Sequence, residues 1–177
     1  MMFFLLFLMA FQTDNAAYDH NPFTKFYKVS VFSQKPLKKY KWSQPPRIRV
    51  CQDTEVSLGR VRRAVNYWER LGYEFGEIYL DRHSFCMNPK DNEIAIVLPS
   101  QGIADDKMAA TRLYTSKFTD EIIKAKIFIF PRSGRKERVL EHEIGHALGW
   151  EHYRQRYHIM YPTWSGGGYD SYGIRKK

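Results

Sequence analysis

The segment HEIGHALGWEH, residues 142–152, brings together three histidines and a glutamate at a spacing that suits a metal ion. His142 and His146 lie four residues apart, so on a helix they occupy one face, one turn apart. Gly149 can adopt a left-handed conformation that ends the helix and reverses the chain. This reversal would let His152 approach the same ion from outside the helix. Three imidazoles that leave a coordination position open are typical of a catalytic rather than a structural zinc site.

Glu143, beside the first of these histidines, indicates what such a site would do. Neutral imidazoles do not cancel the charge of Zn²⁺, so the ion would be a strong Lewis acid that activates a water molecule. The Glu143 carboxylate would take the proton of that water as general base and pass it to the leaving group. A polar helix with surface histidines is the alternative, but three of the six histidines of the chain fall in this one segment.

The length and composition of the chain indicate one folded domain. A chain of 177 residues can bury one substantial core but hardly two. With 44% hydrophobic and 16% aromatic residues, a packed globule is expected rather than a disordered chain. The net charge of +9 favours acidic partners or surfaces. We assign residues 46–165 to the zinc-binding domain and residues 166–177 to a Gly-rich basic tail, which we expect to be loose.

An unbroken apolar run, Met1 to Phe11, precedes this domain. It is too short for a bilayer core, which needs about twenty residues. It has the length of the apolar region of a signal peptide, although no Lys or Arg precedes it, and the NAA triplet at 15–17 is only a passable cleavage site. We interpret residues 1–17 as a secretory signal, which predicts a secreted or otherwise extracytoplasmic protein. An uncleaved hydrophobic anchor and a buried N-terminal segment are the alternatives.

Residues 18–45 form a basic and aromatic lead-in. Between Lys25 and Arg49 the chain carries eight Lys or Arg and no acid, interleaved with aromatic residues. This composition could bind an anionic surface or polymer. It could equally be a solvated, extended lead-in whose aromatic side chains dock on the core. Nothing in it indicates recognition of a specific nucleic acid, and it leaves the oligomeric state open.

The two cysteines, Cys51 and Cys86, allow two interpretations. In an exported protein they could form one disulfide. They could also be two small buried apolar residues. Neither lies in a CxxC pair, which argues against a thiolate zinc site or a redox pair.

The order of the expected elements predicts an α/β or α+β fold. It would contain a five-stranded, mostly parallel twisted sheet with one antiparallel edge strand and two main helices, the second carrying the zinc site. The continuous apolar run after Glu93 suggests a strand buried on both faces, and the polar strand from Ala109 suggests the edge. The expected strands are Arg47 to Cys51, Tyr73 to Leu80, Glu93 to Leu98, Ala109 to Thr115 and Lys126 to Phe130, and the helices are Thr54 to Leu71 and about Lys136 to Leu148.

HEIGHALGWEH, followed by IMYP at residues 159–162, resembles the metzincin zinc proteases and is most similar to the matrixins, the family of the matrix metalloproteinases. The segment VRRAVNYWERLGYEF is similar to the first matrixin helix and the strand after it. The resemblance runs from about Pro46 to Pro162. Astacins carry a Tyr ligand two positions after the Met of this turn, and Pro162 at that position favours the matrixin branch.

The resemblance implies a role for each matching residue. His142, His146 and His152 would be the zinc ligands, Glu143 the general base, and Met160 the residue of the turn beneath the metal. A peptide or protein substrate would bind in extended form along the edge strand, pairing with its main chain. The substrate-binding residues of this strand would be Ala110, Thr111, Arg112 and Leu113. The resemblance further implies that Tyr161 and Pro162 begin the wall of the pocket for the substrate residue after the cleaved bond.

Several matrixin features are not evident in this sequence. There is no PRCG-type cysteine switch, no His- and Asp-rich loop for a second zinc, and no evident C-terminal helix after Met160. Asp105 and Asp106 could bind calcium, but two adjacent acids usually form a solvated turn. We expect Glu141 and Glu151, which flank the zinc motif, to be exposed helix acids rather than partners of the ligands. His158 is expected to be a loop histidine without a metal role.

These observations predict a zinc-dependent endopeptidase. One alternative is a catalytically silent, metal-containing binding module, although such a module could lose Glu143 freely, and Glu143 is intact. Another is a polyanion-binding protein that uses the basic arm of residues 25–49.

Overall fold

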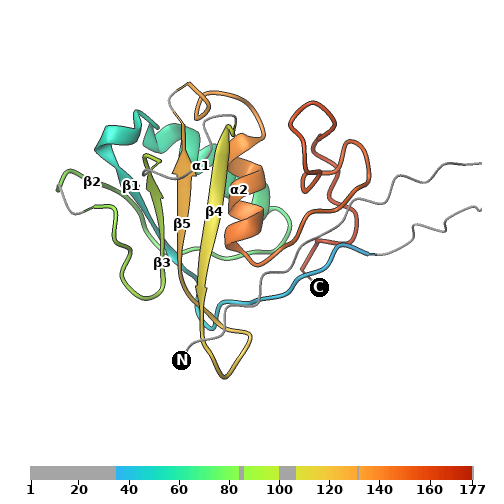
Figure 1. The fold of residues 1–177 in the computed structure, drawn as a ribbon, viewed down its shortest axis with the longest axis horizontal. Helices are drawn as coiled ribbons and strands as arrows, with labels where there is room; N and C mark the ends of the chain where they lie inside the picture. The colour runs from blue at the N-terminus through green and yellow to red at the C-terminus, as the bar shows by residue number, and fades with distance from the viewer. Residues whose placement is uncertain (1–34, 84–85, 100–106, 131, 177) are drawn as a thin grey trace, which may run out of the picture. The chain divides into compact units, whose positions relative to one another are not determined.

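The computed structural model describes residues 35–83, 86–99, 107–130 and 132–176. Its five strands form a single sheet in the order β2-β1-β3-β5-β4 (Figure 1). All neighbouring strands are parallel except β4 and β5, which are antiparallel, as predicted. The elements are β1 (Arg47–Cys51), η1 (Gln52–Thr54), α1 (Leu58–Glu69), β2 (Ile78–Asp81), β3 (Glu93–Val97), β4 (Ala109–Thr115), β5 (Ile122–Ile129) and α2 (Val139–Ala147).

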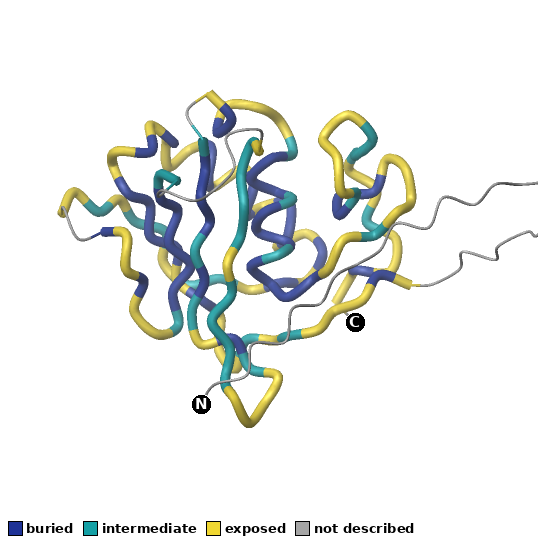
Figure 2. The backbone as a smooth tube through the Cα atoms, in the orientation of Figure 1, coloured by how far each residue is buried: buried dark blue, intermediate teal, exposed yellow. Residues whose placement is uncertain are grey.

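The burial of the strands follows their place in the sheet. All five residues of β3, the central strand, are buried, which confirms the expectation from its continuous apolar run. Among the described strands β4 pairs with β5 alone, and its residues are mostly half-buried (Figure 2). No other described strand occupies the open side of β4, whose main chain could pair with another extended chain.

Both helices pack on one face of the sheet. Side chains of that face, such as Ile48, Ile94 and Ile127, share the main core with α1 and α2. α1 begins at Leu58 rather than at Thr54, because Ser57 is its N-cap and accepts a hydrogen bond from the main-chain N–H of Arg60 at 3.2 Å. The expected start was therefore wrong, since the residues before Ser57 include the separate turn η1.

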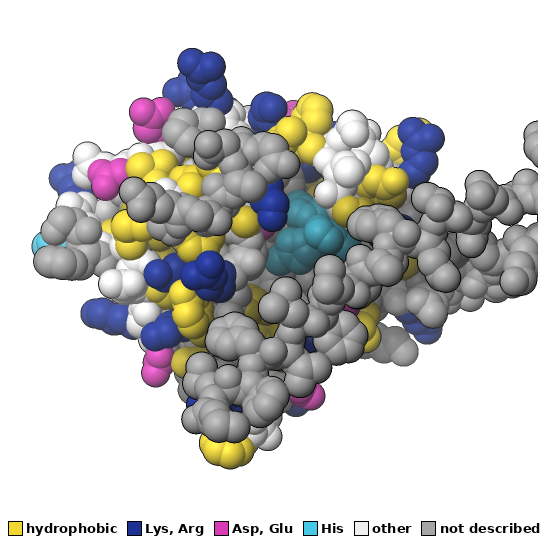
Figure 3. Space-filling model, viewed as in Figure 1, with side chains coloured by type: hydrophobic (Ala, Val, Ile, Leu, Met, Phe, Trp, Pro, Cys, Tyr) yellow, Lys and Arg dark blue, Asp and Glu magenta, His cyan; other side chains and the backbone are white. Residues whose placement is uncertain are grey.

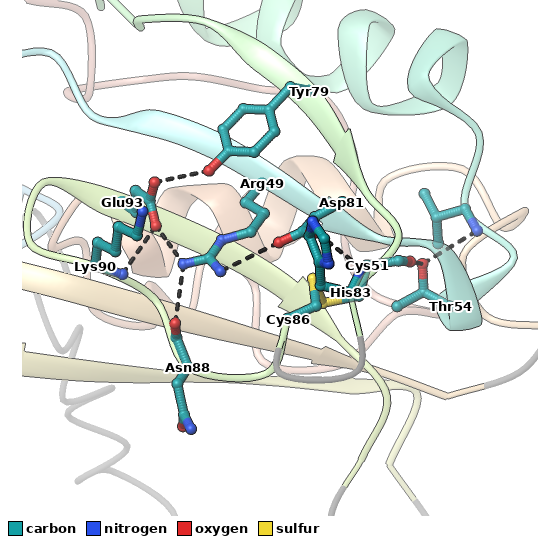
Figure 4. Close-up of a disulfide and its surroundings, with 11 residues drawn as sticks. Arg49, Cys51, Thr54, Tyr79, Asp81, His83, Cys86, Asn88, Lys90 and Glu93 are labelled. Atoms are coloured by element: carbon teal, nitrogen blue, oxygen red, sulfur yellow. Dashed lines mark hydrogen bonds and ion pairs between the residues drawn. A yellow bond between two sulfur atoms is a disulfide. The ribbon is translucent and has the colours of Figure 1, made fainter.

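The opposite face of the sheet carries a smaller cluster that contains a disulfide. Cys51 and Cys86 are bonded, with their Cα atoms 5.6 Å apart, which settles the alternative left open by the sequence. Beside them, the buried Arg49 forms ion pairs with Glu93 and Asp81 (Figure 4). These contacts hold the segment after β2 against the sheet, away from the zinc motif.

The C-terminal residues pack against the domain, so the expectation of a loose tail was wrong. Ile174 is fully buried, and its carbonyl accepts a hydrogen bond from the Tyr73 hydroxyl at 2.9 Å. The main-chain N–H of Lys176 donates to the carbonyl of Leu71 at 2.9 Å. Within the described residues no helix follows α2. Irregular chain therefore covers the end of α1, where the family resemblance implies a helix.

The described part of the basic lead-in, from residue 35, also docks on the domain. The main chain of Lys38 forms an isolated antiparallel β-bridge with that of Trp150, and the main chain of Lys41 forms a parallel one with that of Glu121. The indole N–H of Trp42 donates to the carbonyl of Ala147 at 2.8 Å. This part fits the interpretation of a lead-in whose aromatic side chains dock on the core. The signal segment, residues 1–17, lies outside the described residues, and neither described helix has the length and apolarity to cross a bilayer.

Candidate metal centre

α2 and the turn after it bring the three histidines of the zinc motif together. His142 and His146 lie on one face of α2. The helix ends at Ala147, and Gly149 follows with a φ of +96° in the left-handed region, where a Cβ would collide with the main chain of Tyr40. The chain then reverses, and His152 approaches within 4.6 Å of His146 between ring centroids. One ligand atom from each of the three imidazoles lies within 4.8 Å of the others.

Hydrogen bonds to main-chain carbonyls fix the orientation of the two helical imidazoles. The Nδ1 atoms of His142 and His146 lie 2.7 Å from the Ile159 carbonyl and 2.8 Å from the Trp150 carbonyl. A carbonyl only accepts, so each Nδ1 carries the hydrogen, and each Nε2 of a neutral ring presents a lone pair. The two Nε2 atoms nevertheless face each other at 3.0 Å. Two lone pairs this close repel each other, and a cation between them removes the repulsion, so the donor set fits zinc.

Burial keeps these imidazoles neutral. It lowers the pKa of His142 to about 4 and, assisted by the neighbouring His142, lowers the pKa of His146 to about 3. The pKa of His152 is also lowered, first by burial. Neutral imidazoles are the form that binds a metal ion, so the site is ready to accept one near neutral pH.

Glu143 lies beside the histidines in a buried position and is held by a residue of the edge strand. The hydroxyl of Thr111 on β4 lies 2.6 Å from Oε2 of Glu143 and donates to it. Burial raises the pKa of this carboxyl to about 7, although the Thr111 hydrogen bond lowers it. A general base is most effective when its pKa is near the working pH. The sequence predicts main-chain pairing alone for Thr111, and nothing in the sequence pattern indicates this side-chain contact.

The turn that contains Met160 is packed against α2. Met160 is fully buried and its sulfur lies so close to Gly145 that a Cβ there would collide with it. His158, also fully buried, accepts a hydrogen bond from the Met160 N–H at 3.0 Å and lies 3.1 Å from the Tyr172 carbonyl. These contacts use both ring nitrogens of His158 and brace the turn.

Glu141 differs from our expectation, because it is buried rather than an exposed helix acid. Both of its carboxylate oxygens accept hydrogen bonds from Arg60 of α1, at 2.9 and 2.6 Å. The indole N–H of Trp68 donates to its carbonyl at 2.8 Å. This bidentate pair joins α1 to the helix that carries the first two ligands. Glu151 is exposed, as expected, but it lies after the end of α2 rather than in a helix.

The comparisons with known proteins add a family to this geometry. The family model described as matrixin matches residues 75–176, more than half of the chain. The chain belongs to the matrixin family. The match extends past Pro162, where the resemblance was expected to end, and includes the packed C-terminal residues, but it begins after α1 and so does not test the resemblance expected from Pro46 onward. No curated protein matches the chain.

The candidate metal centre of this matrixin opens into a cleft of about 930 Å³. Figure 3 shows the histidine side chains gathered on this face of the molecule. Of the expected substrate-binding residues, Arg112 does not line the cleft, because its guanidinium lies over the Phe128 ring, 5.6 Å from the ring centroid. The others line it: Ala110, Thr111, Leu113, Tyr161 and Pro162.

The cleft is also lined by cations. Lys39, Lys107 and Arg138 line it. Arg138 precedes α2 and donates to the carbonyl of Gly167, and its guanidinium lies 5.1 Å from the ring centroid of Trp164. These contacts connect the start of α2 to Trp164 and Gly167, which also line the cleft. Asp105 and Asp106 lie outside the described residues, so the calcium interpretation has no counterpart here.

Proposed function

We propose that this matrixin is a zinc-dependent endopeptidase in which Glu143 is the general base. One observation carries the proposal. Three neutral imidazoles converge within 4.8 Å beside a buried carboxyl, at the floor of a cleft bordered by an edge strand. Each part is needed for metal-assisted hydrolysis of a peptide bond: a metal site, a base, and a surface that holds an extended chain.

Zinc, when bound, supplies a Lewis acid that polarises a carbonyl and lowers the pKa of a water molecule toward about 7. The residues of the chain perform the other tasks. The edge main chain of β4 positions an extended substrate by strand pairing, which is independent of sequence. Glu143 takes a proton from the attacking water at its carboxylate and delivers it to the nitrogen of the leaving amine. Thr111 holds the carboxylate in place during both transfers.

The buried, partnered Glu143 argues against a silent binding module. Burying a carboxyl has a cost in stability, because the charged form loses its hydration. A module that only bound a metal or a peptide would gain nothing from this cost. We also propose that the protein works outside the cytoplasm, which the Cys51–Cys86 disulfide supports.

The proposal is tested by cleavage of a peptide library with wild type and Glu143→Ala in the presence of zinc. Loss of a general base should lower kcat about 10²- to 10⁴-fold. The zinc content should stay unchanged, because the three imidazoles remain. Glu137→Ala, which removes an exposed acid near the start of α2, is the matched control and should cleave normally. Near-normal cleavage by Glu143→Ala, or no cleavage by the zinc-loaded wild type, would overturn the proposal.

A further inference from the structure

A second cavity, of about 280 Å³, lies between the start of α1 and the loop that joins β5 to α2. Its wall includes three exposed arginines, Arg63, Arg132 and Arg135. None of them forms an ion pair with another described residue. Arg60 also reaches the wall, but its charge is neutralised by Glu141. One acid, Glu55, lies in the wall, so the free arginines exceed the free acids by two.

The loop that carries two of these arginines is held in place by its own contacts. Ser133 is buried, and successive turns link its main chain to Phe130 and to Lys136 at 3.0 Å each. The Lys136 carbonyl accepts a hydrogen bond from Arg60 at 3.2 Å. Gly134 packs closely on Val56, since a Cβ there would come within 2.7 Å of a Val56 methyl carbon. The cavity is therefore bounded by packed main chain on both sides.

The same loop borders the main cleft. It follows β5, whose last residue, Ile129, pairs with Ala109 at the start of β4. At its other end Arg138 lines the cleft beside Trp164, whose indole N–H donates to the Glu137 carbonyl at 2.9 Å. Trp164 continues the wall that begins at Tyr161 and Pro162. The family resemblance assigns that wall to the substrate residue after the cleaved bond, so the loop that carries Arg132 and Arg135 adjoins the side of the cleft that would hold the C-terminal part of a substrate.

We propose that this cavity binds an acidic segment of the polypeptide substrate, C-terminal to the cleaved bond. The planar fork of a guanidinium matches a carboxylate in a bidentate pair. A surplus of two cations suits one or two carboxylates, whereas a densely charged sulfated polymer would require a longer basic track without Glu55. The inference rests on the proposed endopeptidase function for its substrate, and the cavity would supply the part of substrate selection that the sequence-independent pairing along β4 cannot.

The test uses three versions of one cleavable peptide. The first carries a glutamate block after the cleaved bond, the second carries the same block before the bond, and the third carries a glutamine block after the bond. Wild type should show a KM about tenfold lower for the first peptide than for the third, as expected from two or three exposed ion pairs. The kcat values should be equal, because the cavity touches no reacting group. The advantage should shrink as salt is added.

The variant Arg63→Gln/Arg132→Gln/Arg135→Gln should lose this advantage and cleave the glutamine-block peptide normally. The control Arg62→Gln/Arg70→Gln/Arg82→Gln removes equal charge from exposed residues that do not line the cavity, and should keep most of the advantage. Equal loss in both variants, an undiminished advantage in the first, or an equal benefit from a block before the bond would overturn the proposal.

A binding measurement separates this proposal from the endopeptidase proposal. A fluorescent glutamate-block peptide without a cleavable bond should bind wild type and the control variant, and bind the cavity variant about tenfold more weakly. If this pattern holds and wild type cleaves no peptide, the endopeptidase proposal fails and the cavity remains a binding site. If the peptide does not bind but a sulfated polysaccharide binds through the same arginines, the acidic-segment proposal is overturned.

Discussion

The hydrogen bond between Thr111 and Glu143 makes a specific prediction about catalysis. Thr111→Val removes the hydroxyl but keeps a β-branched side chain of similar size, which suits an edge strand. The lost contact is a 2.6 Å hydrogen bond to Oε2 of a buried carboxyl. Hydrogen bonds to charged groups contribute about 1.5–3 kcal/mol, so we expect kcat to fall about 10- to 100-fold. KM should change little, because the main chain of β4 is unaltered.

The pH dependence of kcat/KM gives the same prediction a second readout. Burial raises the pKa of Glu143 to about 7, and the Thr111 hydrogen bond acts in the opposite direction. Without the hydroxyl the pKa of Glu143 should rise further, so the acid limb of the profile should move to higher pH. A cation in the site lowers this pKa in both proteins and does not change the direction of the shift.

The assay compares wild type, Thr111→Val and Thr111→Ser on one peptide across pH, with zinc content measured for each. Serine restores the hydroxyl and should recover most of the lost kcat. Full zinc content in the valine variant would show that its fold and ligands are intact. If the valine variant keeps wild-type kcat, or if serine fails to restore it, the reasoning about this contact is wrong.

Three further predictions concern stability. Arg60→Met leaves Glu141 buried without its partner and should cost about 3–5 kcal/mol of unfolding free energy, whereas adding Glu141→Leu should recover most of it in chemical denaturation. Gly149→Ala forces a Cβ into a left-handed turn against main chain, and should lower both Tm and zinc affinity, while Gly59→Ala, with open space around it, should not. In the metal-free protein the pKa values of the two histidines of α2 are lowered from 6.5 to about 4 and 3, so below about pH 6.5 these two groups bind fewer protons in the folded state than in the unfolded chain. Glu143, with its pKa raised to about 7, binds one proton more in the folded state and offsets part of this difference. Thermal melts should therefore show a net loss of stability as pH falls from about 6.5 toward 4.

The sequence predicted those features of this fold that depend on local periodicity. The apolar run of β3, the polar edge strand β4 and the helical spacing of His142 and His146 each gave the correct element. The spacing of the zinc motif also required Gly149 to reverse the chain, and its φ of +96° confirms this. Such features follow from the alternation of residues within one segment.

The features that the sequence did not predict depend on contacts between distant segments. Arg60 and Glu141 are 81 positions apart and each resembles an exposed helix charge until α1 and α2 pack together. Ile174 is a lone apolar residue near a Gly-rich stretch, and its burial depends on the end of α1. The side chain of Thr111 reaches Glu143 only because β4 lies against α2, and local pattern contains no information on that contact.

The central claim is that His142, His146 and His152 hold one zinc ion, which activates the water molecule from which Glu143 takes a proton. The most direct test is to titrate zinc into metal-free protein and measure peptide cleavage and bound zinc on the same samples. Cleavage should be absent at the start and rise in proportion to bound zinc until one ion is held per chain, and His146→Ala should abolish both. Cleavage by the metal-free chain, or zinc bound at one ion per chain without cleavage of any library peptide, would contradict the account.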